Sequence, residues 1–490
     1  MTLKKTAVSF FQLVTSRLFV QIINFITLPV ILRYFIPEEY GKVALFSSVV
    51  GAMAVLLNFT ESAKSRFGRE EYDKHQTFQR TFWGTILIKI PVLIIVAVLS
   101  IVYKAELLEY LGMPGSAMML FYVVIILSFF GGNTELLVAT EKFNLISLFS
   151  LSSVVIRVVT IALLILDYVQ PVASYLVLMF VLNIFMKDVL VNFSSYKLMG
   201  MPKFDFGWIR SMLIFSLPFI VHFLSEKTVE YIDAIVIRKY LPFANLGVYS
   251  VAYKMFMFSI VPIELIRVMI KPRIISLYVS ENMEKINWFY KEIVCQVNFF
   301  ISQIFTLSII ALPLLVFFVG REYEESIYPL AVLLTCFSWI PLTNMATPMF
   351  HASKRISPHI GGNIMSAACN LGLNFVLIPR IGIIGGAVST TISMFLSMLI
   401  HLYFLKKFFK INLFYAVIQS FPILIVSMAF VFRLHYGLVV LIYASVAITT
   451  WIAAIRMGMF TEGSLEFYNS LGLPKPFIKI FNNIYMKLVT

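Results

Sequence analysis

The stretch ILRYFIP at residues 31–37, followed by Gly41, decides the fold because a close copy of it occurs later in the chain. The copy is VIRKYLP at residues 236–242, followed by Gly247. Arginine and proline align at an offset of 205 residues and glycine at 206. Each copy precedes a new apolar run, and similarity of this kind predicts two halves of like structure. The alternative is chance similarity between helix ends, where proline and glycine are common.

Composition places the chain in a membrane. Of its 490 residues, 60% are apolar and 13% are charged, and the mean hydropathy is +0.90. Soluble domains carry about 25% charged residues, so a soluble multi-domain enzyme is excluded. The first apolar run continues past the length of a signal segment, and we expect no cleavable leader.

Apolar runs of spanning length occur fourteen times, and a membrane-spanning helix needs about 20 residues. They predict an all-α integral membrane protein with about 14 transmembrane helices, arranged as two parallel six-helix lobes plus two C-terminal helices. The expected regions are an N-terminal lobe at 1–200, a C-terminal lobe at 201–408, two further spans at 409–458 and a cytoplasmic tail at 459–490. The predicted spans are 8–35, 42–59, 82–103, 117–138, 146–166, 172–190, 211–236, 243–266, 293–320, 327–350, 359–378, 383–404, 413–431 and 438–455.

Basic residues predict the orientation. In the loops and at the ends of the spans, 26 lysines and arginines fall on the side of the two termini and 8 on the opposite side. Cytoplasmic loops carry this excess, so both termini are expected in the cytoplasm. The net charge of +14 therefore reports membrane topology rather than nucleic-acid binding.

Five basic residues fall inside the predicted spans. Each costs roughly 2.5–3.5 kcal/mol at the bilayer centre if it is left facing lipid. They must therefore mostly point inward, except that Lys89 is expected to reach the interface from near a helix end. The five are Arg17, Lys89, Arg157, Lys227 and Lys254.

The seventh predicted span carries a stripe of ionisable residues. His222, Glu226, Glu230 and Asp233 lie at i, i+4, i+8 and i+11, on one helix face. Lys227 lies one residue off this stripe. One interpretation is a local ion-pair network that orients the helix. The other is the wall of a water-filled cavity, with residues that serve ion coupling or gating.

Further polar faces support a central cavity. Arg17, Gln21 and Asn24 share a face of the first span, and Asn370 and Asn374 share a face of the eleventh. Asparagine stripes also serve as bonds between membrane helices. Glu61, at the end of the second span, is a weaker candidate for coupling.

The residue types favour an anionic substrate. Guanidinium groups make bidentate contacts with phosphates, and ammonium groups act on them as point charges. Arg17, Arg157, Lys227 and Lys254 together suit a diphosphate headgroup with a polar sugar chain. Parallel helical repeats are typical of transporters whose binding site lies between two lobes.

Catalytic motifs are absent from the sequence. There is no phosphate-binding glycine loop with Lys-Ser/Thr and no paired-histidine metal spacing. The three cysteines lie in apolar stretches, where they form neither a disulfide framework nor a metal site. We expect no enzyme activity, no metal and no cofactor.

Four segments in register resemble one family. The chain is similar to the polysaccharide transporter (O-antigen-type flippase) family of the multidrug/oligosaccharidyl-lipid/polysaccharide exporter superfamily. The segments are LPVILRYFIPEEYG at 28–41, FSLPFI at 215–220, YID at 231–233 leading to LGVYS at 246–250, and NLGLN at 370–374 leading to IPRIGIIGGA at 378–387.

The resemblance implies a flippase of the bacterial cytoplasmic (inner) membrane, which moves a polyprenyl-diphosphate-linked oligosaccharide between leaflets by alternating access. It also implies coupling to H⁺ or Na⁺, contact with membrane lipids, and polysaccharide polymerase and chain-length proteins as partners. Asp233 lies inside a matching motif. The alternatives are a drug or small-molecule cation antiporter of the same superfamily and, from another class, a polysaccharide polymerase or ligase.

Overall fold

The computed structural model describes residues 3–411, 413, 416, 421–469, 482 and 485, and these form helices and connecting segments without a β-strand. The elements are α1 (Leu3–Tyr34), α2 (Pro37–Asn58), α3 (Glu61–His75), α4 (Gln79–Val102), α5 (Lys104–Leu111), α6 (Ala117–Phe130), α7 (Thr134–Ala139), α8 (Phe143–Ile165), α9 (Ala173–Met199), α10 (Phe206–Tyr240), α11 (Phe243–Val279), α12 (Met283–Trp288), η1 (Phe289–Val294), α13 (Cys295–Val319), η2 (Arg321–Ser326), α14 (Ile327–Leu334), η3 (Thr335–Ser338), α15 (Ile340–Ala352), α16 (Ser357–Ile381), α17 (Ile383–Phe409), α19 (Phe421–Val431), α20 (Tyr436–Arg456) and α21 (Glu462–Asn469).

The helices confirm the predicted all-helical membrane fold. Within the described residues, ten helical stretches are long and apolar enough to cross a bilayer, and an eleventh consists of two parts bent by 43°. Three shorter apolar helices, at Leu18–Tyr34, Phe206–Leu217 and Phe421–Val431, take the places of the predicted first, seventh and thirteenth spans. Thirteen of the fourteen predicted spans therefore coincide with helix. Of the thirteenth, 413–431, residues 421–431 are helical, and residues 414, 415 and 417–420 lie outside the described part of the chain.

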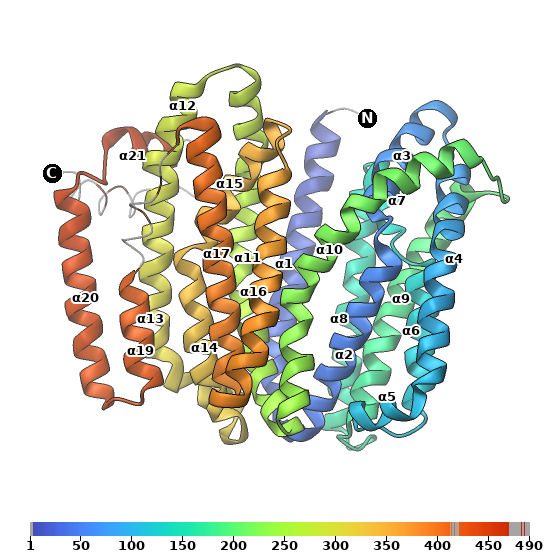
Figure 1. Cartoon of the computed structure of the whole chain (residues 1–490), viewed down its shortest axis with the longest axis horizontal. Coiled ribbons are helices and arrows are strands. Elements are labelled where there is room, and N and C mark those ends of the chain that lie inside the picture. Colours follow the sequence, from blue (N-terminus) through green and yellow to red (C-terminus); the bar gives the residue numbers. More distant parts are fainter. Residues whose placement is uncertain are drawn as a thin grey trace. The chain divides into compact units, whose positions relative to one another are not determined.

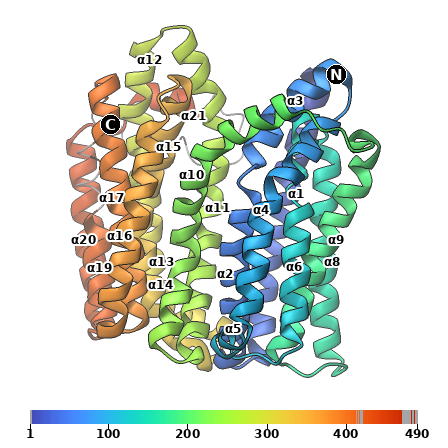
Figure 2. The ribbon, with the colours of Figure 1, turned by 45° about the vertical axis from the view of Figure 1, so that its right-hand side comes forward.

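The chain forms two compact units, each assembled from separate stretches. The first unit comprises Met1–Phe258, Phe317–Ser326 and Leu371–Gly386, and the second comprises Ser259–Val316, Ile327–Asn370 and Ala387–Thr490. In the first unit, α2, α4, α6, α8 and α9 run side by side, with α3 at one end and α5 at the other (Figures 1 and 2). In the second, α19 packs against α20 and α14. The predicted lobe boundaries stay a prediction.

The two halves of the sequence repeat show the same local chemistry. α2 starts at Pro37, where the missing N–H of proline costs nothing and its φ suits a helix. Glu38 and Glu39 lie in the first turn, where carboxylates favour the positive end of the helix dipole. α11 likewise starts directly after Pro242, behind the extended residue Leu241.

The repeat glycines bring these two helix starts into backbone contact. A Cβ on Gly41 would overlap the carbonyl oxygen of Phe243, and a Cβ on Gly247 would overlap that of Pro37. The contact is reciprocal, because Phe243 lies 206 residues after Pro37 and Gly247 lies 206 after Gly41. A pseudo-twofold relation between α2 and α11 follows, and only glycine permits it.

A helix break also repeats. The span of α6 and α7 is interrupted at residues 131–133, and the span of α14, η3 and α15 is interrupted at Trp339. Asn133 and Trp339 are again 206 residues apart. A break in the fourth predicted span thus recurs in the tenth.

We predict that Gly41→Ala destabilises the fold, because the added methyl group meets backbone that cannot turn aside. Overpacking of this kind costs about 1–3 kcal/mol. Thermal unfolding of the purified protein, followed by size-exclusion fluorescence, should show a midpoint lowered by several degrees.

Gly361→Ala is the matched control. Gly361 is also helical, and nothing lies within 4 Å of the place its Cβ would take. Alanine is the better helix former, so the midpoint should hold or rise. Equal midpoints for the two variants would contradict the close backbone contact.

Candidate functional site

Asp233 lies at a buried junction of three helices in the first unit. Its side chain comes from α10 and is 1% exposed. The Tyr249 hydroxyl of α11 donates to Oδ2, and Asn374 Nδ2 of α16 donates to Oδ1 at 2.6 Å. Two of the four family-like segments, one with Asp233 and Tyr249 and the other with Asn374, therefore meet at one carboxylate. A carboxylate that accepts from hydroxyl and amide donors ties its helices together.

The two asparagines predicted for the substrate cavity are fully buried. Asn374 bonds to Asp233, and Asn370 Nδ2 donates to Thr390 Oγ1 of α17 at 3.1 Å. Both side chains join helices in this structure. This is the alternative role of asparagine stripes in membrane helices.

Arg157 and Lys254 form a basic cluster on hydroxyl groups. Arg157 Nε of α8 donates to Thr27 Oγ1 of α1 at 3.0 Å. Lys254 Nζ of α11 donates to the Tyr40 hydroxyl of α2 at 2.6 Å and also lies 4.7 Å from the ring centroid of Tyr40. The Tyr40 hydroxyl also acts electrostatically on Arg157, so four helices of one unit contribute to this basic cluster.

No carboxylate balances the basic cluster. Among the described residues, neither Arg157 nor Lys254 has an acidic group within the 4.0 Å of an ion pair. Arg157 is half-buried and Lys254 is exposed. Two cations held only by neutral oxygen atoms remain able to bind an anion.

The polar face of α1 continues from the basic cluster. Gln21 and Asn24 are half-buried and precede Thr27 at spacings of three residues, on one helix face. Thr27 Oγ1 donates to the Ile23 carbonyl at 2.6 Å, so its oxygen is fixed toward α8. The side chains of Arg17, His222 and Glu226 lie outside the described part of the structure.

Lys227 differs from the basic cluster because a carboxylate, that of Glu230, pairs with it. Its Nζ lies 2.5 Å from Glu230 Oε2, and the side chains are 38% and 28% exposed. The Tyr231 ring beside them packs against Gly51 of α2, whose Cβ would lie 2.5 Å from the ring. Two of the residues predicted for cavity and gating therefore form an ion pair within α10.

The sequence analysis missed a pair of fully buried lysines. Lys89 was expected to reach the interface, and that expectation is wrong, because its side chain is 0% exposed. Lys64, which the topology argument places in a loop, is buried as well and belongs to α3. Both bond to the broken span of α6 and α7, and Glu61 lies at the same break. The dipeptide Gly131-Gly132 inside an apolar run was the available signal.

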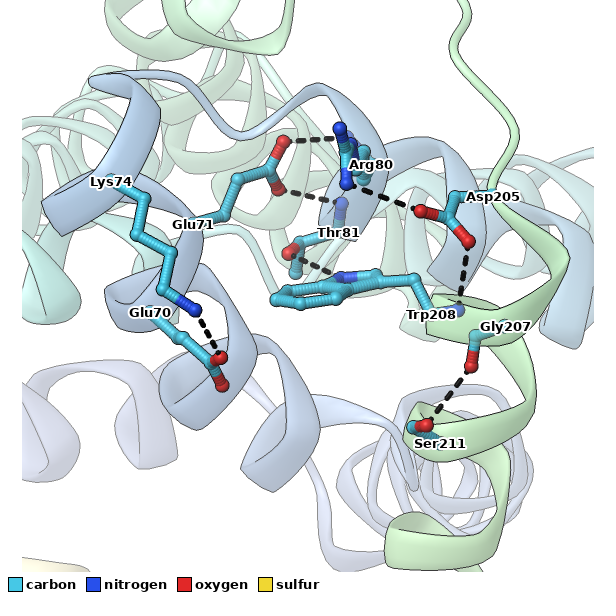
Figure 3. A network of polar contacts seen from close by, with 9 residues as sticks. All are labelled: Glu70, Glu71, Lys74, Arg80, Thr81, Asp205, Gly207, Trp208 and Ser211. Carbon is cyan, nitrogen blue, oxygen red and sulfur yellow. Dashed lines mark hydrogen bonds and ion pairs between the residues drawn. The ribbon is translucent and has the colours of Figure 1, made fainter.

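A polar network at the start of α10 joins it to α3 and α4 (Figure 3). The buried Glu71 carboxylate accepts the backbone N–H groups of Arg80 and Thr81, each at 2.8 Å, at the positive end of α4. Arg80 Nη1 in turn lies 3.1 Å from Asp205 Oδ2. Asp205 caps α10 by accepting from the Trp208 backbone at 3.1 Å, and the Trp208 indole donates to Thr81 Oγ1 at 3.2 Å.

We predict that Glu71→Gln lowers stability, because the amide nitrogen turns a donor toward a backbone N–H that needs an acceptor. A buried hydrogen-bonding group left unpaired costs about 1–3 kcal/mol. The midpoint of thermal unfolding should fall by several degrees.

Lys74→Ala supplies the control for this variant. Lys74 pairs with Glu70 on the exposed face of α3 at 2.9 Å (Figure 3), and exposed pairs of this spacing contribute about 0.3–0.5 kcal/mol. Equal unfolding temperatures for Glu71→Gln and Lys74→Ala would show that the polar network of Glu71 does not stabilise the fold.

The fold and these charged groups define a class. The helices are long and apolar, and a helix break recurs along the chain. Arg157 and Lys254 lie between helices and are bonded to neutral oxygen atoms. These features define a multi-pass membrane protein with the architecture of a transporter.

Comparison with solved structures agrees with this fold. An inward-facing multidrug resistance MATE family transporter of the MOP superfamily superposes with a TM-score of 0.65, at 13% identity over 81% of this chain and 98% of that one. The lipid II flippase MurJ in an inward closed conformation gives 0.64, at 15% identity over 90% and 98%. A search of curated protein sequences found no match.

The chain belongs to the polysaccharide biosynthesis protein family, whose model matches residues 7–266. This membership confirms the family resemblance of the four segments, and the two structural neighbours share the fold of this chain.

Proposed function

We propose that this protein is a flippase for a polyprenyl-diphosphate-linked oligosaccharide, a surface polysaccharide repeat unit. The lipid-linked sugar moves from the inner to the outer leaflet of the bacterial cytoplasmic membrane by alternating access. Family membership supports a role in polysaccharide biosynthesis, and MurJ shows the same fold in a protein named as a flippase.

The observation that carries the proposal is the unbalanced charge of Arg157 and Lys254. A diphosphate supplies the negative charge that these side chains lack, and its oxygen atoms suit the planar fork of arginine and the ammonium of lysine. A cationic drug would instead require acidic groups in their place.

The surroundings of the basic cluster suit a sugar chain. Thr27, Tyr40, Gln21 and Asn24 offer hydroxyl and amide groups, which exchange hydrogen bonds with sugar hydroxyls. Arg17 belongs to the same proposal through its place on this face of α1. Lys227 contributes less, since Glu230 already neutralises it.

Ion coupling and gating are assigned to Asp233 and to the other ionisable residues predicted for this role. Asp233, with its donors from α11 and α16, is the proposed gate, because any change in its charge alters bonds to two other helices. Glu230, Glu226, His222 and Glu61 retain their predicted part in coupling. Both termini are placed in the cytoplasm by the distribution of basic residues.

We predict that Arg157→Ala and Lys254→Met each slow transport by about 10- to 100-fold, since a hydrogen bond to a charged group contributes about 1.5–3 kcal/mol. The measurement is mass spectrometry of polyprenyl-linked oligosaccharides in a deletion strain that expresses each variant. Complete repeat units should accumulate on the cytoplasmic side in both.

Lys104→Met is the control, because Lys104 is an exposed lysine of α5, and it should restore the wild-type pool. Arg157→Lys separates net charge from bidentate geometry. Unchanged lipid-linked pools in the deletion strain, with drug efflux lost, would favour a small-molecule antiporter instead.

A further inference from the structure

Two ammonium groups of the first unit converge on the end of one broken helix. Lys64 Nζ donates to the Gly131 carbonyl at 2.7 Å, and Lys89 Nζ lies 3.5 Å from the same oxygen. Lys89 also reaches the carbonyls of Phe129 at 3.2 Å and Ser128 at 3.4 Å. These oxygens belong to the last turn of α6 and the first residue after it, where helical partners are missing.

The break depends on two glycines. Gly131 is extended, with φ −78° and ψ −170°, and Gly132 has a left-handed φ of +74°. In a continuous helix the N–H groups of Gly132 and Asn133 would bond to the carbonyls of Ser128 and Phe129. Lys89 thus takes the place of these two backbone donors, and Lys64 bonds to the Gly131 carbonyl beyond them.

Charged and polar groups from every neighbouring element face the lysine pair. Glu61 of α3, Glu135 of α7 and Asp188 of α9 are half-buried carboxylates that act on Lys64, and Glu61 and Asp188 also act on Lys89. Asn133 Oδ1 accepts from Lys64 at 2.9 Å, and Asn58 Oδ1 accepts from Lys89 at 3.1 Å. The pair has local counter-charges and lies shut away from solvent.

The second break provides an internal comparison. In the last turn of α14, the Val332 carbonyl accepts from Thr335 at 2.6 Å and from Thr391 at 3.3 Å, while the Ala331 carbonyl accepts from Ser427 at 2.9 Å. Neutral hydroxyl groups therefore satisfy these carbonyls, which lie where α14 gives way to η3, ahead of the break at Trp339.

Nothing in helix breaking itself requires lysine. The positions 206 residues after Lys64 and Lys89 are Ile270 and Cys295. Burying two ammonium groups costs free energy, whereas a threonine supplies a hydrogen-bond donor without a charge. The charge of the two lysines therefore serves a purpose beyond the fold.

We infer that Lys64 and Lys89 form a proton-exchange site whose occupancy sets the state of the α6–α7 break. An ammonium group carries three N–H donors and a neutral amine carries two. When a lysine gives its proton to one of the half-buried carboxylates beside it, which passes the proton on to solvent, one carbonyl of the α6 end loses its donor. An unpaired carbonyl is costly in a bilayer, and closing residues 131–133 into helix restores the missing bonds.

This site deepens the proposed function by naming the proton as coupling ion, and to that extent it rests on that function. Protonated lysines hold the span broken, and deprotonated lysines let it become continuous. Glycine at 131 and 132 keeps the exchange accessible, because glycine adopts both backbone conformations readily.

The test is hydrogen exchange of residues 128–134 in the full-length protein in lipid nanodiscs, from pH 6 to pH 9, with exchange times scaled for the intrinsic rate. Wild-type protein should gain several-fold protection as pH rises. Lys89→Arg keeps its charge throughout, so the segment should stay exchangeable at every pH. Gly132→Ala disfavours the left-handed residue of the break and should move the gain in protection to lower pH.

Lys197→Met is the matched control, since Lys197 is an exposed lysine near the end of α9; its pH response should equal that of wild type. An absent response in wild type, or an unchanged response in Lys89→Arg that elutes as folded protein, overturns the inference.

Proteoliposomes under a pH gradient separate this inference from the proposed function. Wild type should move the lipid-linked oligosaccharide faster with the gradient, and Lys89→Arg should lose that acceleration. If hydrogen exchange of residues 128–134 depends on pH as expected while the lipid-linked oligosaccharide is not transported, the proposed function is wrong and the proton-exchange site is retained.

Discussion

The contact between the backbones of α2 and α11 constrains the rest of the first unit. Gly41 and Gly247 each lie against a carbonyl of the other helix, so the two helix starts meet without side chains between them. That contact places Tyr40 of one repeat beside Lys254 of the other. The bond between Lys254 and Tyr40 in the basic cluster therefore follows from one close crossing.

Charge inside the apolar bundle is handled in three ways. Lys227 is matched by a carboxylate on its own helix, and Lys64 and Lys89 use backbone carbonyls freed by a break. Among the described residues, Arg157 and Lys254 are hydrogen-bonded to hydroxyl groups and have no carboxylate as partner. Because an uncompensated charge is expensive inside a bilayer, the third arrangement is the one on which the proposed function rests.

Much of the fold could be read from the sequence because lipid imposes a simple rule: a span is a long apolar helix. The site was harder, because its partners are far apart in the chain. Asp233 was identified as a candidate by its motif, yet Asn374, its partner 141 residues away, was assigned to a cavity. Lys89 was misjudged for the same reason, since the carbonyls that hold it become available only where Gly131 interrupts a helix that hydropathy presents as continuous.

The most direct measurement is transport by the purified protein in proteoliposomes that contain two fluorescent polyprenyl lipids with the same oligosaccharide. One carries a diphosphate linkage and the other a neutral one, and a membrane-impermeant quencher reports the leaflet of each. The account predicts that the diphosphate lipid crosses several-fold faster and only when the protein is present. Equal rates for the two lipids, or transport of organic cations in place of both, would contradict it.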